Sequence, residues 1–133
     1  MNYKVFTRHL RSLEDNRRTM ADLAFQLDNI VYDMGGVKGL RYDLQAVHGN
    51  PSVKEEKRLE MVERYNEKLK EYEFIREQIS FIENTLNKMP EELKTMLDEV
   101  YIQGMTFSHV GKLHGYSDHG LWKMMKRETE QYL

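Results

Sequence analysis

Apolar residues recur at alternating intervals of three and four in two long stretches of this chain. In residues 4–34 they fall at Leu10, Leu13, Met20, Ala24, Leu27, Val31 and Met34. Arg17 fills the seam position that is missing from this series. Such a narrow stripe is typical of a coiled-coil seam, whereas a helix on a globular core has a wider apolar face. The spacing predicts one long helix, which Gly35 and Gly36 end because glycine suits the left-handed cap of a helix.

A second long helix is predicted over residues 52–89. Ser52 can cap its start, and Glu55 three residues later completes a capping box. Its seam contains Leu59, Val62, Leu69, Tyr72, Ile79, Ile82, Leu86 and Met89. Asn66 occupies a further seam position, and successive intervals of three that end at Ile75 predict a stammer, which is a local overwinding. Two such helices joined by a loop imply an antiparallel hairpin.

Two helices of this kind bury only one narrow apolar stripe each, so the hairpin needs a further packing partner. We expect it to pair with a second copy in a four-helix bundle, which makes the protein a homodimer; the alternative is that the C-terminal domain folds back over the seam. Residues 35–53 form the loop between the helices and are rich in glycine. This loop is either a flexible hairpin tip or a contact surface made by Lys38, Arg41 and Tyr42.

Composition limits the classes of protein that are possible. Charged residues make up 32% of the chain and there are two prolines, which suits long exposed helices. The absence of cysteine excludes disulfides and cysteine-ligated zinc and fits a reducing compartment. The N-terminus has no apolar signal core, and no run of about 18 apolar residues is present. A cytoplasmic protein that does not span a membrane is therefore expected.

The C-terminal stretch, residues 90–133, predicts a small domain of three short helices. Their approximate bounds are 91–103, 106–114 and 117–132. Gly104 and Gly115 separate the helices, and Gly111 supplies a small residue where two helices can cross closely. The residues expected to point inward are Val110, Tyr116, Leu121 and Met124. Helix, glycine turn and helix is the plan of the helix-turn-helix, whose second helix enters the DNA major groove.

On this plan the outer side of the last helix carries the candidate DNA contacts. They are Ser117, His119, Trp122, Lys123, Lys126 and Arg127. The three cations can neutralise phosphates or read guanine edges, and His119 can donate to a base or a phosphate. Ser117 and the free amides at the helix start can hold a phosphate. Trp122 either packs on a neighbouring helix or contacts a thymine methyl or a sugar.

Four features oppose DNA binding. Asp118 puts a negative charge at the tip that would enter the groove, and Gly120 lowers the stability of the helix by about 1 kcal/mol relative to alanine. His114 stands where a core leucine is expected. The net charge of the whole chain is −2, and residues 90–133 alone also carry more acidic than basic side chains. A dimer that presents two such domains would add their contacts to one DNA molecule.

The C-terminal domain resembles the helix-turn-helix of sigma factor region four. The matching residues are Met89-Pro90, Tyr101 and Gly115-Tyr116-Ser117, and the match covers about a third of the chain. With the loop match at residues 36–43 (GVKGLRYD), the layout is similar to small phage and prophage proteins of Gram-positive bacteria. Such proteins, related to the ArpU and RinA groups, are usually described as transcriptional regulators. The resemblance implies DNA binding through residues 117–127, although Gly111, His114 and the tip at residues 118–120 depart from the pattern.

Two classes of function remain open. In the first, the protein is a phage-type transcriptional regulator that binds double-stranded DNA as a dimer. In the second, it is an interaction protein that binds a host protein through the same domain or the helical hairpin. That partner would be RNA polymerase, or a CRISPR nuclease that the protein inhibits. The three cations of the last helix favour the first class, and Asp118 with the negative net charge favours the second.

No pattern of catalytic residues is present, so we do not expect an enzyme. There is no glycine-rich phosphate loop, no serine elbow and no motif of paired carboxylates. His109, His114 and His119 are spaced by five residues, which scatters them around a helix instead of gathering them on one face. The sequence therefore predicts neither a metal site nor a cofactor.

Overall fold

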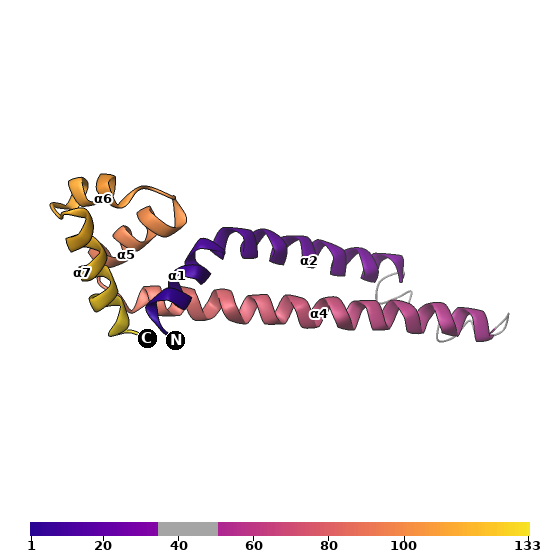
Figure 1. Ribbon diagram of the computed structural model, residues 1–133. Coiled ribbons are helices and arrows are strands. Elements are labelled where there is room, and N and C mark those ends of the chain that lie inside the picture. Colours follow the sequence, from indigo (N-terminus) through magenta and orange to yellow (C-terminus); the bar gives the residue numbers. More distant parts are fainter. Residues whose placement is uncertain (35–50) are drawn as a thin grey trace. The chain divides into compact units, whose positions relative to one another are not determined.

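The computed structural model describes residues 1–34 and 51–133 (Figure 1), which are helical with no strand. The elements in chain order are α1 (Tyr3–Arg11), α2 (Leu13–Asp33), α4 (Pro51–Asn87), α5 (Glu91–Leu97), the π-helix η1 (Asp98–Ile102), α6 (Phe107–His114) and α7 (Asp118–Glu130). This confirms the predicted all-α class. Among the described residues, no helix combines the length and the apolar character that crossing a bilayer requires.

The chain forms two compact units. Unit 1 contains Met1–Arg17 together with Glu77–Leu133, and unit 2 contains Arg18–Arg76. The sequence predicted a division into residues 1–89 and 90–133, and the observed division differs because residues 1–17 and 77–89 belong to the unit that contains residues 90–133. The N-terminal helix α1 belongs with the C-terminal helices because it packs on η1 and α7.

The predicted single helix over residues 4–34 is interrupted at Ser12. Helix α1 ends at Arg11 and α2 begins at Leu13. The hydroxyl of Ser12 donates a hydrogen bond to the carbonyl oxygen of Arg8 at 3.1 Å, and the Ser12 amide donates to the same oxygen at 3.2 Å. Serine side chains compete in this way with the regular helical ladder. The break at Ser12 lets α1 belong to the core of unit 1.

The core of unit 1 gathers apolar side chains from every helix of the unit. Its most buried members include Phe6, Leu10, Leu13, Met96, Leu97, Val110, Leu121 and Met125. The predicted inward positions of Val110 and Leu121 are confirmed. The predictions for Met124 and Tyr116 are wrong, because Met124 is half-buried and Tyr116 is 37% exposed. The buried stripe of α7 runs through Leu121, Met125 and Thr129 at intervals of four.

In unit 2, α2 and α4 lie side by side and run in opposite directions (Figure 1). The buried residues here are Leu23, Leu27 and Ile30 of α2, and Met34 directly after the helix. The seam therefore passes through Leu23 and Ile30, not through the predicted Ala24 and Val31, of which Val31 is 36% exposed. Each predicted residue is adjacent to the observed one, so the apolar pattern alone did not fix the register.

Most of the predicted seam of α4 is covered in the structure. Between residues 61 and 86, the covered apolar side chains are Met61, Val62, Tyr65, Leu69, Tyr72, Ile75, Ile79, Ile82 and Leu86. The predicted seam residue Leu59 is 49% exposed instead. Lys68 is half-buried within this series, because a lysine can cover apolar surface with its stem while its ammonium group remains in water.

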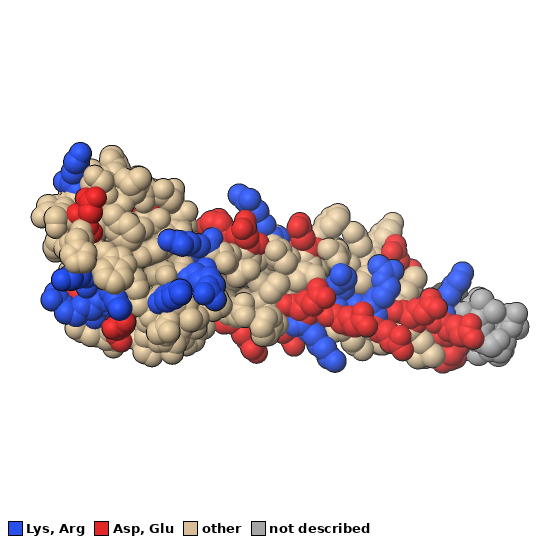
Figure 2. Space-filling view, in the orientation of Figure 1, with Lys and Arg blue, Asp and Glu red and all other residues tan. Residues whose placement is uncertain are grey.

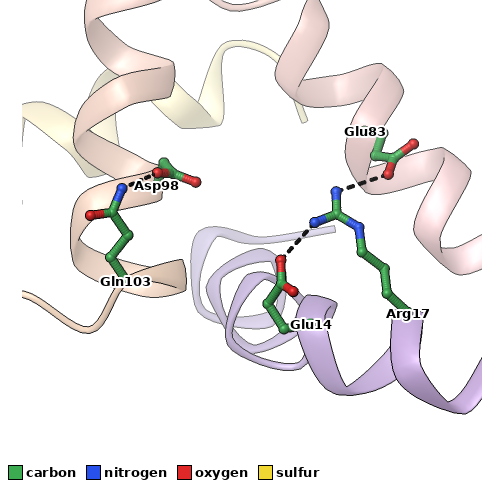
Figure 3. A network of polar contacts seen from close by, with 5 residues as sticks. All are labelled: Glu14, Arg17, Glu83, Asp98 and Gln103. Atoms are coloured by element: carbon green, nitrogen blue, oxygen red, sulfur yellow. Dashed lines mark hydrogen bonds and ion pairs between the residues drawn. The ribbon is translucent and has the colours of Figure 1, made fainter.

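Arg17, predicted as a seam residue, pairs with acids of two helices in unit 1. Its guanidinium donates to Glu14 at 2.7 Å and to Glu83 of α4 at 3.0 Å (Figure 3). All three side chains are substantially exposed, so this network adds little stability, on the order of 1 kcal/mol or less for each pair. It does link the start of α2 to the end of α4. The loop candidates Lys38, Arg41 and Tyr42 lie outside the described residues.

Candidate nucleic-acid interface

Local sequence signals build the two-helix element of α6 and α7. Thr106 precedes α6, and its hydroxyl accepts a hydrogen bond from the amide of His109 at 3.1 Å. Gly115 ends α6 in the left-handed conformation with φ 82°, which glycine adopts without strain. Ser117 then caps α7, because its hydroxyl accepts from the amide of Gly120 at 3.1 Å. These caps agree with the boundaries predicted from the sequence.

Gly111 is required by a close backbone contact within this element. A Cβ atom on Gly111 would lie 2.5 Å from the carbonyl oxygen of Tyr116. The carbonyl oxygen of Gly111 also accepts a hydrogen bond from the amide of Tyr116 at 2.7 Å. The sequence predicted a small residue here for the crossing of two helices. The close approach is instead between α6 and the turn that leads into α7.

The outer face of α7 presents the predicted DNA contacts to solvent. Ser117, His119, Trp122, Lys123 and Arg127 are exposed, and Lys126 is half-buried. Asp118 is exposed at the same end of the helix. Arg127 lies 3.4 Å from the carboxylate of Glu128, and its side chain is 72% exposed. The cationic face of α7 therefore remains accessible to a polyanion.

Three of these side chains form a stack along α7. The rings of His119 and Trp122 lie nearly parallel, with an interplanar angle of 16° and 6.3 Å between centroids. The ammonium group of Lys126 lies 5.3 Å from the centroid of the Trp122 ring. Trp122 remains 39% exposed. Cation–π contact of this kind restrains a lysine while leaving its N–H donors free for an acceptor.

His114 has a structural partner in η1. Its Nε2 lies 3.0 Å from a carboxylate oxygen of Glu99, which is 9% exposed. The unexpected histidine is therefore explained by a polar contact between α6 and η1. In the described part of the chain, no group of three metal-ligating side chains comes together.

Helix α1 brings a basic face to unit 1 that the sequence interpretation missed. Lys4, Arg8 and Arg11 are exposed on α1 at helical intervals of four and three. The guanidinium carbon of Arg11 lies 5.2 Å from the centroid of the Tyr101 ring. In Figure 2, Lys and Arg side chains gather over the α1 and α7 regions of unit 1, whereas both signs of charge intermix along α4. The i, i+4, i+7 spacing in residues 4–11 was the available signal.

A buried tyrosine pair fastens α1 to η1. The hydroxyl groups of Tyr3 and Tyr101 lie 2.7 Å apart, and their rings meet edge to face. Burial, and secondly the hydrogen bond with Tyr101, raises the pKa of the Tyr3 hydroxyl. Burial also raises the pKa of Tyr101, and this rise is partly offset by the hydrogen bond with Tyr3 and by the nearby Arg11. Both hydroxyls therefore stay protonated at neutral pH, and the pair holds α1 in place.

The candidate interface thus consists of the exposed face of α7, held by two capped turns, with the basic face of α1 in the same unit. Its chemistry is that of a surface for anions: exposed cations, one acid at the tip of α7, and aromatic rings that restrain Arg11 and Lys126. Comparisons of this chain with protein-family models, with curated proteins and with solved structures found no match.

Proposed function

We propose that this protein is a phage- or prophage-encoded transcriptional regulator that binds double-stranded DNA through α7. The observation that carries the proposal is the exposed face of α7, where Lys123, Lys126 and Arg127 follow a capped glycine turn. Cations on the second helix of such a pair are placed to contact phosphates and base edges. The phage assignment rests on the resemblance of residues 36–43 and 89–117. The protein would act in the cytoplasm of a bacterial host cell.

We also propose that the protein acts as a homodimer formed through unit 2. This unit exposes large apolar side chains: Phe25 is 67% exposed, Tyr32 82% and Phe74 62%. Covering such side chains stabilises an association by about 25 cal/mol for each Å² of apolar surface removed from water. A dimer would place two α7 helices on one DNA molecule, which raises the effective affinity of each weak contact.

The direct test is a binding titration on DNA fragments from the region that surrounds the gene, at near-physiological salt. The wild type is compared with the Lys123→Ala/Lys126→Ala/Arg127→Ala variant. A matched control, Arg64→Ala/Lys70→Ala/Arg76→Ala, removes the same charge from exposed positions of α4 in unit 2. We expect fragment-selective binding by the wild type and the control, and its loss in the α7 variant. Equal weak binding by all three proteins would contradict the proposal.

A second candidate function is binding to a host protein, either RNA polymerase or a CRISPR nuclease. The observation that favours it lies around the turn before α7. Leu113 at the end of α6 is 58% exposed and Tyr116 in the turn is 37% exposed, and the acidic Asp118 follows at the start of α7. An apolar and acidic surface suits a protein better than a phosphate backbone. A complex with one copy of either partner, unchanged by the α7 triple substitution, would support this function over DNA binding.

A further inference from the structure

A groove in unit 1 lies between α1 and α7, next to the cationic face of α7. Its volume is about 470 Å³. The side chains that give it its chemistry are Lys4, Arg11, Tyr101, Phe107, Trp122 and Lys126. Helix α1 therefore contributes directly to a cavity that also borders the stack on α7.

The charges around the groove favour an anion. Three cations and one acid, Glu130, line it. In the described part of the chain, Lys4, Arg11 and Lys126 form no ion pair with a carboxylate. Positive charges that are not held in an ion pair, and that outnumber the acids around a concave site, raise the local concentration of anions there.

Aromatic rings hold two of these cations without using their hydrogen-bond donors. Arg11 lies over the Tyr101 ring and Lys126 over the Trp122 ring. Contact with the face of a ring leaves the N–H groups in the guanidinium plane, and those of the ammonium, free to donate. A planar guanidinium fork with free donors matches the geometry of a phosphate group.

We propose that this groove binds the phosphodiester backbone of the same DNA that α7 contacts, so that α1 forms the second half of the interface. The inference rests on the proposed function of α7. DNA is the favoured occupant because Trp122 and Lys126 line the groove and also belong to the proposed DNA-binding face of α7, so that one extended polyanion can contact both surfaces. Helix α1 supplies Lys4 and Arg11 as phosphate contacts, which add affinity and carry no base readout.

The test measures the salt dependence of DNA affinity for the wild type and for Lys4→Ala/Arg11→Ala. The probe is the fragment bound most tightly in the titration above or, if none is bound selectively, a mixed-sequence duplex at low salt. Each phosphate contact contributes about 0.9 to the slope of log affinity against log salt. We expect the magnitude of the slope to fall by the amount that corresponds to about two phosphate contacts. The control variant Lys70→Ala/Arg76→Ala on α4 should leave the slope unchanged.

Arg11 contacts the Tyr101 ring, so its loss can also disturb folding. Lys4→Glu is therefore measured in parallel, because Lys4 is exposed and makes no ring contact. Weaker binding and a smaller slope for Lys4→Glu, with an unchanged unfolding midpoint, would support the inference. Wild-type binding by both α1 variants, together with loss in the α7 triple variant, would overturn the role of α1 and leave the proposed function standing. No DNA binding by the wild type would overturn both.

Discussion

Gly111 has no room for a side chain, although it lies within α6. We expect Gly111→Ala to destabilise the protein, because overpacking against the rigid carbonyl of Tyr116 costs about 1–3 kcal/mol. The better helix propensity of alanine returns at most about 1 kcal/mol. Urea unfolding measures the difference. Ser108→Ala in the same helix is the control and should stay within about 0.5 kcal/mol of wild type; a Gly111→Ala variant as stable as this control would contradict the close contact.

The Tyr3–Tyr101 pair should make stability sensitive to alkaline pH. A tyrosine whose pKa is raised by folding contributes stability that is fully present below its unfolded pKa of about 10. That contribution is lost as the pH rises above this value, because the unfolded chain releases its protons first. The variant Tyr3→Phe/Tyr101→Phe should therefore lose less stability than wild type between neutral pH and pH values above 10.

Thermal unfolding over this pH range provides the measurement. Tyr32 is 82% exposed, so Tyr32→Phe is the matched control and should keep the wild-type pH dependence. An alkaline loss of stability that is the same in the double variant and in wild type would show that the buried pair does not cause it.

At the residue level, the turn before α7 was predictable because its signals are local. Thr106, Gly115 and Ser117 specify caps through their own chemistry, within a few residues of the helices that they begin or end. The position of Lys4 and Arg11 at the groove beside α7 was not predictable in this way. It depends on α1 packing beside α7, more than 90 residues later in the sequence, and no short-range pattern encodes that contact.

Among the elements, η1 and α6 are joined by the contact of Glu99 with His114. Removing the histidine alone leaves a buried carboxylate without its partner, at a cost of about 1–3 kcal/mol. We expect His114→Leu to be destabilised by this amount and Glu99→Leu/His114→Leu to regain much of the loss. The two single variants and the double variant form a thermodynamic cycle by urea unfolding. Additive effects would show that the two residues are independent.

The register of the helical hairpin gives a prediction for α2. Ile30 is 5% exposed in the seam, and its neighbour Val31 is 36% exposed. Ile30→Ala should therefore cost about 2–5 kcal/mol, whereas Val31→Ala should cost less than about 1 kcal/mol. Thermal or urea unfolding of both variants decides between the two registers. A larger loss for Val31→Ala would favour the register that the sequence first suggested.

The existence of the long helices was predictable and their register was not. Heptad spacing, a low proline content and strong helix formers together predict helices. The choice between Leu23 and Ala24, or between Ile30 and Val31, involves adjacent apolar residues that suit a seam equally well. The packing of α2 against α4 decides it, and that information is tertiary.

At the level of the whole molecule, unit 1 is built from two separated segments of the chain. We expect a fragment of residues 90–133 alone to be largely unfolded, because it lacks the cover that α1 gives to Tyr101 and α7. Residues 1–17 joined by a flexible linker to residues 77–133 should fold. Circular dichroism and the dispersion of amide NMR signals compare the two polypeptides. A stably folded 90–133 fragment would contradict the assignment of α1 to unit 1.

The packing of α1 on η1 also has a consequence in time. Tyr3 leaves the ribosome 98 residues before its partner Tyr101. At a synthesis rate of about 5–20 residues per second, about 5–20 seconds pass before the residues that pack on the apolar face of α1 have been made. During that interval Tyr3, Phe6 and Leu10 are exposed on a nascent chain and are open to capture by chaperones. The surface that we propose for DNA can therefore assemble only after α7 has left the exit tunnel.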